Sequence, residues 1–428
     1  MNAMLDLAGI GIGPFNLSIA ALADRQRLDT RFYDAKPAFD WHPGMMLPEA
    51  SMQTSCLKDL VTPVDPTHPL TFLNYLVAHQ RFYSFMNADQ AAVSRQEFGD
   101  YLRWAAGQLH SLRFGSRVRE VRFDNDRFRI RHDQGSQAAA NICVGVGKQP
   151  FYPANSGRHA GARCFHAIDM QRAPRNLAGR RVTVIGGGQS GAEIVLHALQ
   201  GHWGSPARIS WISRRENFLP LDESPFTNEF FSPAYVDSFR QLSDCERRRT
   251  VDSQKLASDG ISIDTLRALY QAIYRRVHVE GDAGAVACLP GRELTDLQGG
   301  GDFCVTTRHR QTGATEVLHS DYVILCTGFV SRLPDCLTPL AERMTLDPAG
   351  LPKLGAHFEA RWDGPAERRI FMVNAGRYSH GIAEPQLSLM AWRAARVVNA
   401  LLGRRVYQAE DGPGLIDWHR ATAARAVA

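Results

Sequence analysis

Two glycine-rich turns constrain the fold of this chain more than any other feature of its sequence. The first lies in AGIGIGPFNLSIAALA at residues 8–23, and the second in VTVIGGGQSGAEIVLHAL at residues 182–199. In each case a short apolar run comes before the glycines and an apolar helical pattern follows them. A strand, a tight turn and a helix in this order place N–H donors of the helix against a pyrophosphate. The two turns therefore predict an α/β fold with two dinucleotide-binding units.

The first turn carries a variant of the G-x-G-x-x-G fingerprint. Gly9 and Gly11 fit its first two positions, and Pro14 takes the third, because proline is tolerated as the first residue of a helix. The next predicted strand, residues 30–35, leads to Asp34. An acid at this place can accept a hydrogen bond from a ribose 2′-hydroxyl, so the first unit is predicted to bind FAD or NAD.

The second turn has the complete fingerprint in Gly186, Gly188 and Gly191. Its second strand, within residues 207–218, ends differently, because Arg214 and Arg215 stand where an acid is expected in the first unit. Two guanidinium groups suit the 2′-phosphate of NADP. One FAD-like site and one NADPH-like site together indicate a flavoprotein oxidoreductase.

The order of these patterns predicts two Rossmann-like domains, one inserted into the other. Residues 1–171 and 336–428 are expected to form a discontinuous FAD-binding domain, and residues 172–335 an NADPH-binding domain. Residues 220–280 change to helical spacing rich in aromatic, arginine and aspartate residues, which predicts a mainly helical substrate-binding insertion. A late apolar run ends in CTGF, and its Gly328 fits the end of an NADPH-binding domain.

Composition excludes several other classes of protein. The 428 residues are 44% hydrophobic, and 49 basic against 44 acidic residues leave a dispersed net charge of +5, which does not favour nucleic-acid binding. No run of about 18 apolar residues predicts a transmembrane helix. The N-terminus lacks the features of a signal peptide, so a cytoplasmic location is expected. The eight cysteines form no C-x-x-C pair, and neither a metal site nor a redox-active disulfide is expected.

Seven segments together resemble the N-hydroxylating flavin monooxygenases of siderophore biosynthesis. They are GIGIGPFNLSIAALA, FDWHPGMMLP, MQTSCLKDLVTPVDPTHPLTFLNYL, SRQEFGDYLRWAA, GGGQSGAE, SPFTNEFF and HGIAEPQLSLMAWR. The resemblance covers nearly the whole chain and is greatest to the bacterial lysine N6-hydroxylases of the aerobactin type. It implies FAD- and NADPH-dependent hydroxylation of the side-chain amine of L-lysine by dioxygen, through a C4a-hydroperoxyflavin, on the route to a hydroxamate siderophore. The flavin carries this chemistry, so no side chain is assigned with certainty as catalytic.

The resemblance also implies which residues contact the cofactors. His380 could act as a general base, but a structural histidine held by hydrogen bonds is the favoured interpretation. The FAD set is Gly9, Gly11, Gly13, Pro14, Asn16, Asp34, Trp41, His42, Gln53, Gly328, His380 and Leu387. The NADPH set is Gly186, Gly188, Gln189, Ser190, Gly191, Glu193, Arg214 and Arg215.

Three residues are expected to contact the substrate: Gln53, Lys58 and Asn228. Lys58 stands among apolar neighbours, and the resemblance implies that it holds the substrate carboxylate, which favours an amino acid over a diamine. The alternatives are an ion pair with Asp59 or a solvated surface lysine. Asn228 matches an asparagine that contacts the α-end of the substrate in ornithine hydroxylases, whereas an acid is expected there in the aerobactin-type lysine enzymes.

Other functions remain open at this point. Within the family, the substrate could be L-ornithine or a diamine such as putrescine or cadaverine. A flavin-dependent pyridine-nucleotide reductase is the alternative from a different class, although it would need a redox-active cysteine pair. The resemblance further implies a homotetramer, since family members often assemble in this way.

Overall fold

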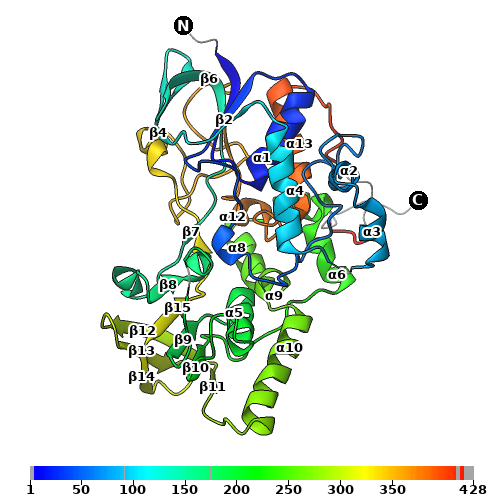
Figure 1. The fold of residues 1–428 in the computed structure, drawn as a ribbon. Coiled ribbons are helices and arrows are strands. Elements are labelled where there is room, and N and C mark those ends of the chain that lie inside the picture. The colour runs from blue at the N-terminus through cyan, green and yellow to red at the C-terminus, as the bar shows by residue number, and fades with distance from the viewer. Residues whose placement is uncertain (1–3, 91, 174, 411–414, 419–428) are drawn as a thin grey trace, which may run out of the picture.

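The computed structural model describes residues 4–90, 92–173, 175–410 and 415–418. Figure 1 shows two lobes, each built on its own sheet, with helices between them. The upper lobe holds the N-terminal third of the chain together with its C-terminal part. The lower lobe holds most of the middle of the sequence. The prediction of two α/β units is therefore confirmed.

The sheet of the first domain has seven strands, with β1 between β2 and β6 in parallel pairing. Strand β17, from the C-terminal part of the chain, pairs in parallel with β6 and completes this core. β4 and β5 extend the sheet as an antiparallel hairpin whose turn residues, Asn125 and Asp126, both have positive φ. The strands are β1 Leu5–Ile10, β2 Thr30–Tyr33, β3 Leu112–Arg113, β4 Val118–Asp124, β5 Arg127–His132, β6 Gly135–Val144 and β17 Ile370–Met372.

Helices from both ends of the chain cover this sheet. α1 (Pro14–Arg25) packs along α13 (Met390–Leu402), and α4 (Arg95–Gly107) lies beside them (Figure 1). α4 begins at Ser94, whose side chain accepts a hydrogen bond from the Glu97 N–H at 3.1 Å, as in other capped helices. The remaining helices of this domain are α2 Phe72–Ala78, α3 Phe82–Asn87, α11 Thr338–Ala341 and α12 Arg377–His380.

The sheet of the second domain is entirely parallel, in the order β11-β10-β9-β15-β8. α5 (Gln189–Leu199) follows β9, and a separate three-stranded antiparallel sheet packs nearby. The strands are β8 Cys164–His166, β9 Arg181–Ile185, β10 Arg208–Ile212, β11 Val286–Leu289, β12 Arg292–Gln298, β13 Phe303–His309, β14 Thr315–Ser320 and β15 Tyr322–Leu325.

The chain crosses between the two domains at one antiparallel pair of short strands. β7 (Gln149–Pro150) leads out of the first domain and pairs with β16 (Phe329–Val330), which leads back. The expected bounds of the second domain, residues 172 and 335, stay a prediction. In the structure β8 precedes residue 172 and pairs with β15 of the second sheet, and β16 precedes residue 335. A three-residue strand such as β8 leaves too short a periodic pattern to be found in the sequence.

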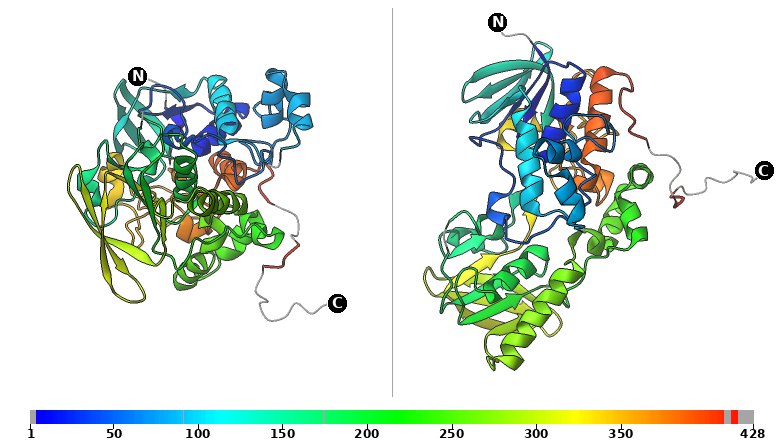
Figure 2. Two further views of the ribbon diagram at one scale, coloured as in Figure 1. Left: turned by 60° about the horizontal axis from the view of Figure 1, so that its bottom comes forward. Right: turned by 45° about the vertical axis from the view of Figure 1, so that its right-hand side comes forward.

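The predicted helical insertion is present between β10 and β11. Its helices are α6 Pro225–Asn228, α7 Pro233–Phe239, α8 Asp244–Ser253, α9 Lys255–Asp259 and α10 Ile263–Tyr274. α7 and α8 contact α12 of the first domain, and α10 packs against α5 of the second. The insertion therefore lies against both domains, and the long α10 runs down the side of the lower lobe in the right-hand view of Figure 2.

Candidate active site

The two glycine turns have closely similar backbone geometry. Gly13 and Gly188 each precede the first residue of a helix, with φ and ψ of −105° and −178° for the first and −113° and −175° for the second. Gly11 and Gly186 both have positive φ, and each donates its N–H at 2.8 Å to the last residue of the neighbouring strand. Gly11 and Gly13 therefore correspond in position to Gly186 and Gly188.

This correspondence corrects the fingerprint read from the first turn, which begins two residues later than expected. Gly9 lies inside β1, where a Cβ atom would come within 1.9 Å of the Phe32 ring, so it serves packing in the sheet. The third position belongs to Asn16 and not to Pro14. Asn16 is buried and donates from Nδ2 to the Gly11 carbonyl at 2.7 Å, and its counterpart Gly191 would place a Cβ 2.1 Å from the Gly186 carbonyl.

Both turns fit a bound pyrophosphate. A Cβ on Gly13 or Gly188 would meet none of the described atoms within 4 Å, and no described side chain caps either helix. Within the described part of the chain, the N–H groups of Phe15 and Asn16 have no acceptor, and the same holds for Ser190 and Gly191. Open space in front of unpaired N–H groups is what an anion at a helix N-terminus requires.

Asp34 lies at the predicted strand end, but much of its carboxylate is used within the protein. It accepts from the Ile12 N–H at 2.6 Å and from the Lys36 N–H at 2.8 Å. Lys36 also donates to the Ile12 carbonyl at 3.1 Å. The pair therefore holds the glycine turn against the end of β2, and any contact between Asp34 and a ribose would add to this structural role.

The end of β10 carries a cluster of cations. Arg214 is exposed, while Arg215 donates to the Asp259 carbonyl at 2.8 Å and leaves Nη1 buried without a partner. Lys255, which the sequence analysis missed, lies close to both, and burial together with the two arginines lowers its pKa. Three cations held together in this way favour binding of an anion such as a 2′-phosphate.

The side chains of two residues expected to contact NADPH are bonded to other protein groups. Both carboxylate oxygens of Glu193 accept from Arg95 of α4, at 3.0 and 2.8 Å. Gln189 donates to Glu193 at 2.9 Å and accepts from the Ser262 N–H at 2.8 Å. Both side chains are thus held by protein partners, and their contact with NADPH stays a prediction. Helical periodicity alone does not show what a second domain places against a helix face.

The loop after β2 places aromatic residues beside the crossing between the domains. Trp41 packs its ring edge on Phe98 at 6.0 Å, and His42, at a φ of +50°, lies 6.3 Å from the Phe329 ring of β16. Desolvation, with help from nearby cations including Lys36, lowers the pKa of His42 to about 4. The ring is therefore neutral at pH 7.

The side chain of Gln53, which was expected to contact both FAD and the substrate, is exposed.

Gly328 is held in the same crossing. It has a φ of +79°, and its carbonyl oxygen accepts from the Phe151 N–H at 3.0 Å and lies 3.0 Å from His166 Nε2. A Cβ there would meet nothing within 4 Å. Backbone conformation is thus the reason for glycine at this position.

The C-terminal segment brings unpaired polar atoms together beneath α1. Arg393 and Glu384, both fully buried, lie 3.9 Å apart, and the guanidinium lies over the Phe15 ring at 4.2 Å.

His380 is buried, stacks on Phe358 at 4.1 Å and lies 2.8 Å from the Ser379 hydroxyl, which supports the structural interpretation over a general base. Leu387 packs against the first core. Buried polar atoms of this segment without a partner are Asn374 Oδ1, His380 Nε2, Glu384 Oε2, Ser388 Oγ, Arg393 Nε and Arg393 Nη1.

Lys58 is half-buried and is not paired with its neighbour. Asp59 points inward and accepts from the N–H groups of Val61, Thr62 and Phe72 at 2.9, 2.7 and 2.6 Å. The ammonium group of Lys58 has no partner in the described residues. One alternative interpretation, an ion pair with Asp59, is therefore wrong, and an anionic ligand remains a reasonable partner.

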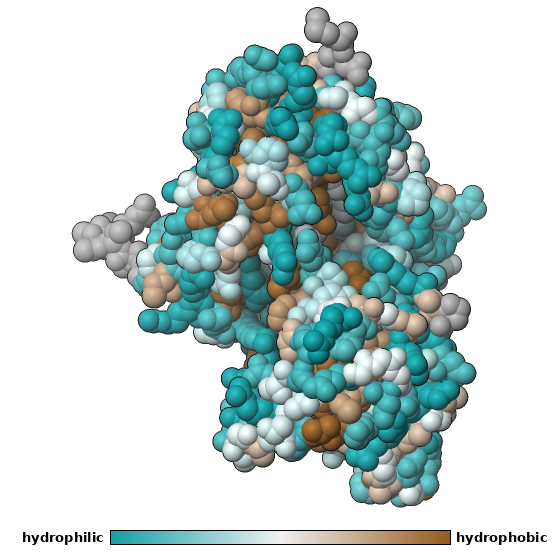
Figure 3. Space-filling view, turned by 90° about the vertical axis from the view of Figure 1, so that its left-hand side faces the viewer, coloured by the Kyte–Doolittle hydropathy of each residue, from teal (hydrophilic) through white to brown (hydrophobic). Residues whose placement is uncertain are grey.

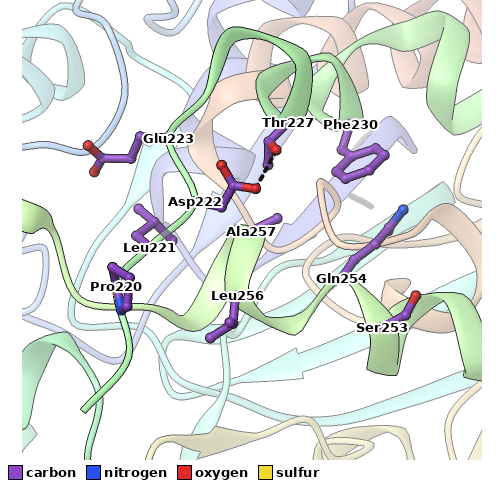
Figure 4. A pocket seen from close by; sticks show the side chains of 10 residues that line it. All are labelled: Pro220, Leu221, Asp222, Glu223, Thr227, Phe230, Ser253, Gln254, Leu256 and Ala257. Atoms are coloured by element: carbon purple, nitrogen blue, oxygen red, sulfur yellow. Dashed lines mark hydrogen bonds between the residues drawn. The ribbon is translucent and has the colours of Figure 1, made fainter. Parts of the chain in front are cut away.

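Asn228 lies at the end of α6 and is exposed. Its side chain donates to the Glu223 carbonyl at 3.4 Å, and no hydrogen bond among the described residues joins it to Lys58. Beside it, a pocket of about 680 Å³ opens between α6 and the α8–α9 corner. Figure 4 shows Thr227 bonded to Asp222 at one wall and the Phe230 ring and Gln254 at the other. Its acidic and amide lining could accept a cationic amine.

Comparison with known proteins decides the family. The family model described as L-lysine 6-monooxygenase/L-ornithine 5-monooxygenase matches residues 3–331. The L-lysine N6-monooxygenase of Escherichia coli is 45% identical over 99% of this chain and 100% of its own length. The chain belongs to this family.

Solved structures of family members share the whole architecture. An FAD-bound cadaverine monooxygenase from Erwinia amylovora has a TM-score of 0.91 at 28% identity, covering 99% of this chain and 100% of that one. An ornithine N-hydroxylase from Kutzneria sp. 744, with reduced FAD, NADP+ and L-ornithine, has a TM-score of 0.85 at 27% identity over 94% and 99%. The two dinucleotide-binding domains predicted from the turns, and the flavin monooxygenase fold implied by the resemblance, are both confirmed.

The described residues contain no group of three or more metal-ligating side chains, and none of their helices has the length and apolar character needed to span a bilayer. All eight cysteines are free. The surface seen in Figure 3 has apolar side chains on the upper lobe and around the junction of the lobes, above a largely hydrophilic lower lobe.

Proposed function

We propose that this protein hydroxylates the side-chain amine of L-lysine at N6, using FAD, NADPH and dioxygen, to supply a hydroxamate siderophore. The observation that carries the proposal is the pair of open helix N-termini, Gly13 and Gly188, which differ at the neighbouring strand end. The strand next to the first turn, β2, leads to Asp34. The strand next to the second turn, β10, leads to the cations Arg214 and Arg215. This combination suits one nucleotide with a free ribose hydroxyl and one with a 2′-phosphate.

The residues that would hold FAD are the turn at Gly11 and Gly13, the N–H groups at the start of α1, and Trp41 and His42 in the loop after β2. Gln53, Leu387 and the polar atoms around Arg393 would surround the ring. When bound, FAD supplies the activation of dioxygen and the transfer of one oxygen atom to the amine nitrogen. Gly186, Gly188 and Ser190 would bind the NADPH pyrophosphate, and the cluster of Arg214, Arg215 and Lys255 its 2′-phosphate.

The protein must also deliver the amine in its neutral form. A free lysine amine has a pKa of about 10.4 and arrives protonated, so it has no lone pair to react. Exclusion of water favours the neutral amine. In this proposal Lys58 and Asn228 hold the α-end of the substrate, which leaves the amine free to reach the flavin. No side chain is assigned as a dedicated base, because His380 is buried and occupied by packing.

The test of the proposal is product identification from a mixture of amines. The purified holoenzyme would be incubated with NADPH, air and equal amounts of L-lysine, L-ornithine, putrescine and cadaverine, and the products measured by mass spectrometry. We expect N6-hydroxylysine as the main product, with one NADPH consumed per product. Hydroxylated ornithine or diamine as the main product would overturn the choice of substrate. NADPH oxidation without any hydroxylamine would favour the reductase alternative.

Replacement of Lys58 tests the carboxylate contact. Lys58→Ala is expected to raise KM for L-lysine about 10- to 100-fold, the range for loss of a hydrogen bond to a charged group. Any activity on cadaverine should be unchanged, because this diamine has no carboxylate. Steady-state oxygen consumption with each amine measures both values.

Lys353→Ala is the matched control for Lys58, since Lys353 is a surface lysine of the same domain paired with Asp244 at 3.1 Å. This variant should leave both the KM for L-lysine and any activity on cadaverine unchanged. An equal loss of activity on lysine and cadaverine in Lys58→Ala would contradict the role of Lys58 as a carboxylate ligand.

The cation cluster at the end of β10 should determine the preference for NADPH over NADH. Arg214→Ala combined with Lys255→Ala is expected to raise KM for NADPH about 100-fold or more, because two charged contacts to phosphate are lost. KM for NADH should change little. Arg267→Ala, at an exposed ion pair on α10, is the control. An equal rise in KM for NADPH and for NADH would show that the cluster does not contact the 2′-phosphate.

The remaining predictions belong to the same proposal. L-Ornithine and the diamines stay as alternative substrates, and Asn228 is the residue whose role depends most on that choice. A homotetramer is expected and is tested by light scattering coupled to size-exclusion chromatography. A cytoplasmic location is expected from the dependence on NADPH.

A further inference from the structure

A bidentate ion pair joins the two nucleotide-binding domains at a buried place. Arg95, the first residue of α4, donates to both oxygens of Glu193 on α5, at 3.0 and 2.8 Å. The side chain of Glu193 is 6% exposed and that of Arg95 18%. Two parallel N–H···O bonds restrict the angle between the groups as well as their separation. The pair therefore constrains orientation and not only distance.

The segment of the first domain next to this pair enters the core of the second. Leu47 and Ala50 belong to the same apolar cluster as Val182 and Val184 of β9. A Cβ on Gly44 would lie 1.7 Å from the Ile168 carbonyl of the second domain, so the two backbones touch here. The ion pair thus lies at the edge of a close-packed contact.

Two hydrogen bonds tie α4, this segment and α5 into one unit. The Arg95 N–H donates to the Ala50 carbonyl at 2.8 Å. On the other side, His197 Nε2 of α5 lies 2.7 Å from the Pro48 carbonyl oxygen. Residues 44–50 are therefore held from both domains, and we call this segment the inter-domain strap.

The ion pair is connected directly to the second glycine turn. Gln189, the first residue of α5, donates to Glu193 at 2.9 Å from one helical turn away. Gly188 and the free N–H groups of Ser190 and Gly191 lie at the same turn of helix. Ser190 and Glu193 also line one small crevice with Gly44 and Leu47 of the strap. A change in the ion pair would therefore move the place where a pyrophosphate binds.

We infer that Arg95 and Glu193 are positioning residues that set the orientation of the NADPH-binding domain relative to the FAD-binding domain. The inference rests on the proposed function for the identity of the two nucleotides. Neither residue touches the reacting atoms. Their effect is on the angle at which the second domain presents its nucleotide to the first, and small misplacements of reacting groups reduce rates strongly.

The test uses Arg95→Met and Glu193→Gln, alone and combined, in the FAD-loaded enzyme. Glu193→Gln keeps the size of the side chain and its bond to Gln189, so it serves if Arg95→Met folds poorly. At saturating NADPH, each single variant is expected to reduce the rate of flavin reduction about 10- to 100-fold in stopped-flow absorbance. The combined variant should be no slower than the slower single variant, because the two residues act as one pair.

Two further measurements separate positioning from a general loss of structure. Flavin reduction by dithionite should be unchanged, since this small reductant does not depend on the second domain. Hydrogen–deuterium exchange of the strap should be faster in the variants, while exchange in β1 and β6 stays at the wild-type level. Arg103→Met, at an exposed ion pair on the same helix α4, is the matched control and should behave as wild type.

The outcomes distinguish this inference from the proposed function. If wild-type protein took up no FAD or was not reduced by NADPH, the proposed function would fail, whereas exchange in the strap would still test the ion pair. If the variants kept the wild-type rate of reduction by NADPH, or lost reduction by dithionite to the same extent, the positioning role would be overturned. Unchanged exchange in the strap would overturn it as well.

Discussion

Gly13→Ala is expected to give a folded protein that has lost most of its affinity for FAD. A Cβ at this position meets no protein atom within 4 Å, and the φ of −105° is accessible to alanine. The methyl group would instead stand in the open space before the N-terminus of α1, where the pyrophosphate must approach. Crowding of this kind costs about 1–3 kcal/mol, so the Kd of FAD should rise about 10- to 100-fold. Flavin fluorescence titration of the apoprotein measures this value.

Gly188→Ala is the paired control, because its backbone and surroundings match those of Gly13. It should leave the flavin bound and raise only KM for NADPH. Gly11→Ala should behave differently from both. Its φ of +86° is unfavourable for alanine, and a Cβ would lie 2.6 Å from the Gly145 carbonyl, so the protein itself should be destabilised. Full FAD affinity in Gly13→Ala would contradict the placement of the phosphate site.

Arg393→Met is expected to destabilise the first domain by about 3–5 kcal/mol, the range for a buried ion pair that loses one partner. Arg393 and Glu384 are each 1% exposed, and Arg393 also donates to the Glu384 carbonyl. Methionine fills similar volume but leaves Glu384 as an unpaired charge in the core. Urea denaturation followed by circular dichroism, with FAD in excess, measures the change in the free energy of unfolding.

The double variant Arg393→Met with Glu384→Gln should recover much of this loss, because no charge then remains buried. Arg103→Ala, at a surface pair, should change stability by less than about 0.5 kcal/mol. The effects of the two core substitutions on the free energy of unfolding could instead be additive. In that case the pair does not act as a unit, and the stability of this region comes from its apolar contacts.

Some of the site was predictable from short stretches of sequence, because local chemistry decides those features. Gly188, Gly191 and the arginines after β10 follow directly from a turn that must be tight and from a phosphate that must be neutralised. The hairpin at Asn125 and Asp126 is equally local, since both residues tolerate positive φ.

Other features could not be predicted because they depend on what a distant segment supplies. Glu193 has the helical spacing of a nucleotide contact, yet Arg95, far away in the sequence, takes both of its oxygens. Lys255 joins the cation cluster only because α9 folds back towards β10. The Arg393–Glu384 pair is buried because helices from both ends of the chain close over it.

The sequence by itself determined that this protein has two strand–turn–helix units with different phosphate chemistry, since backbone freedom at glycine and charge at a strand end are properties of a few adjacent residues. Only the tertiary structure decided the true position of the first fingerprint, where Asn16 takes the place of a glycine, and the contact that sets one domain against the other. Those features arise from packing and charge pairing between distant segments, and no local pattern carries that information.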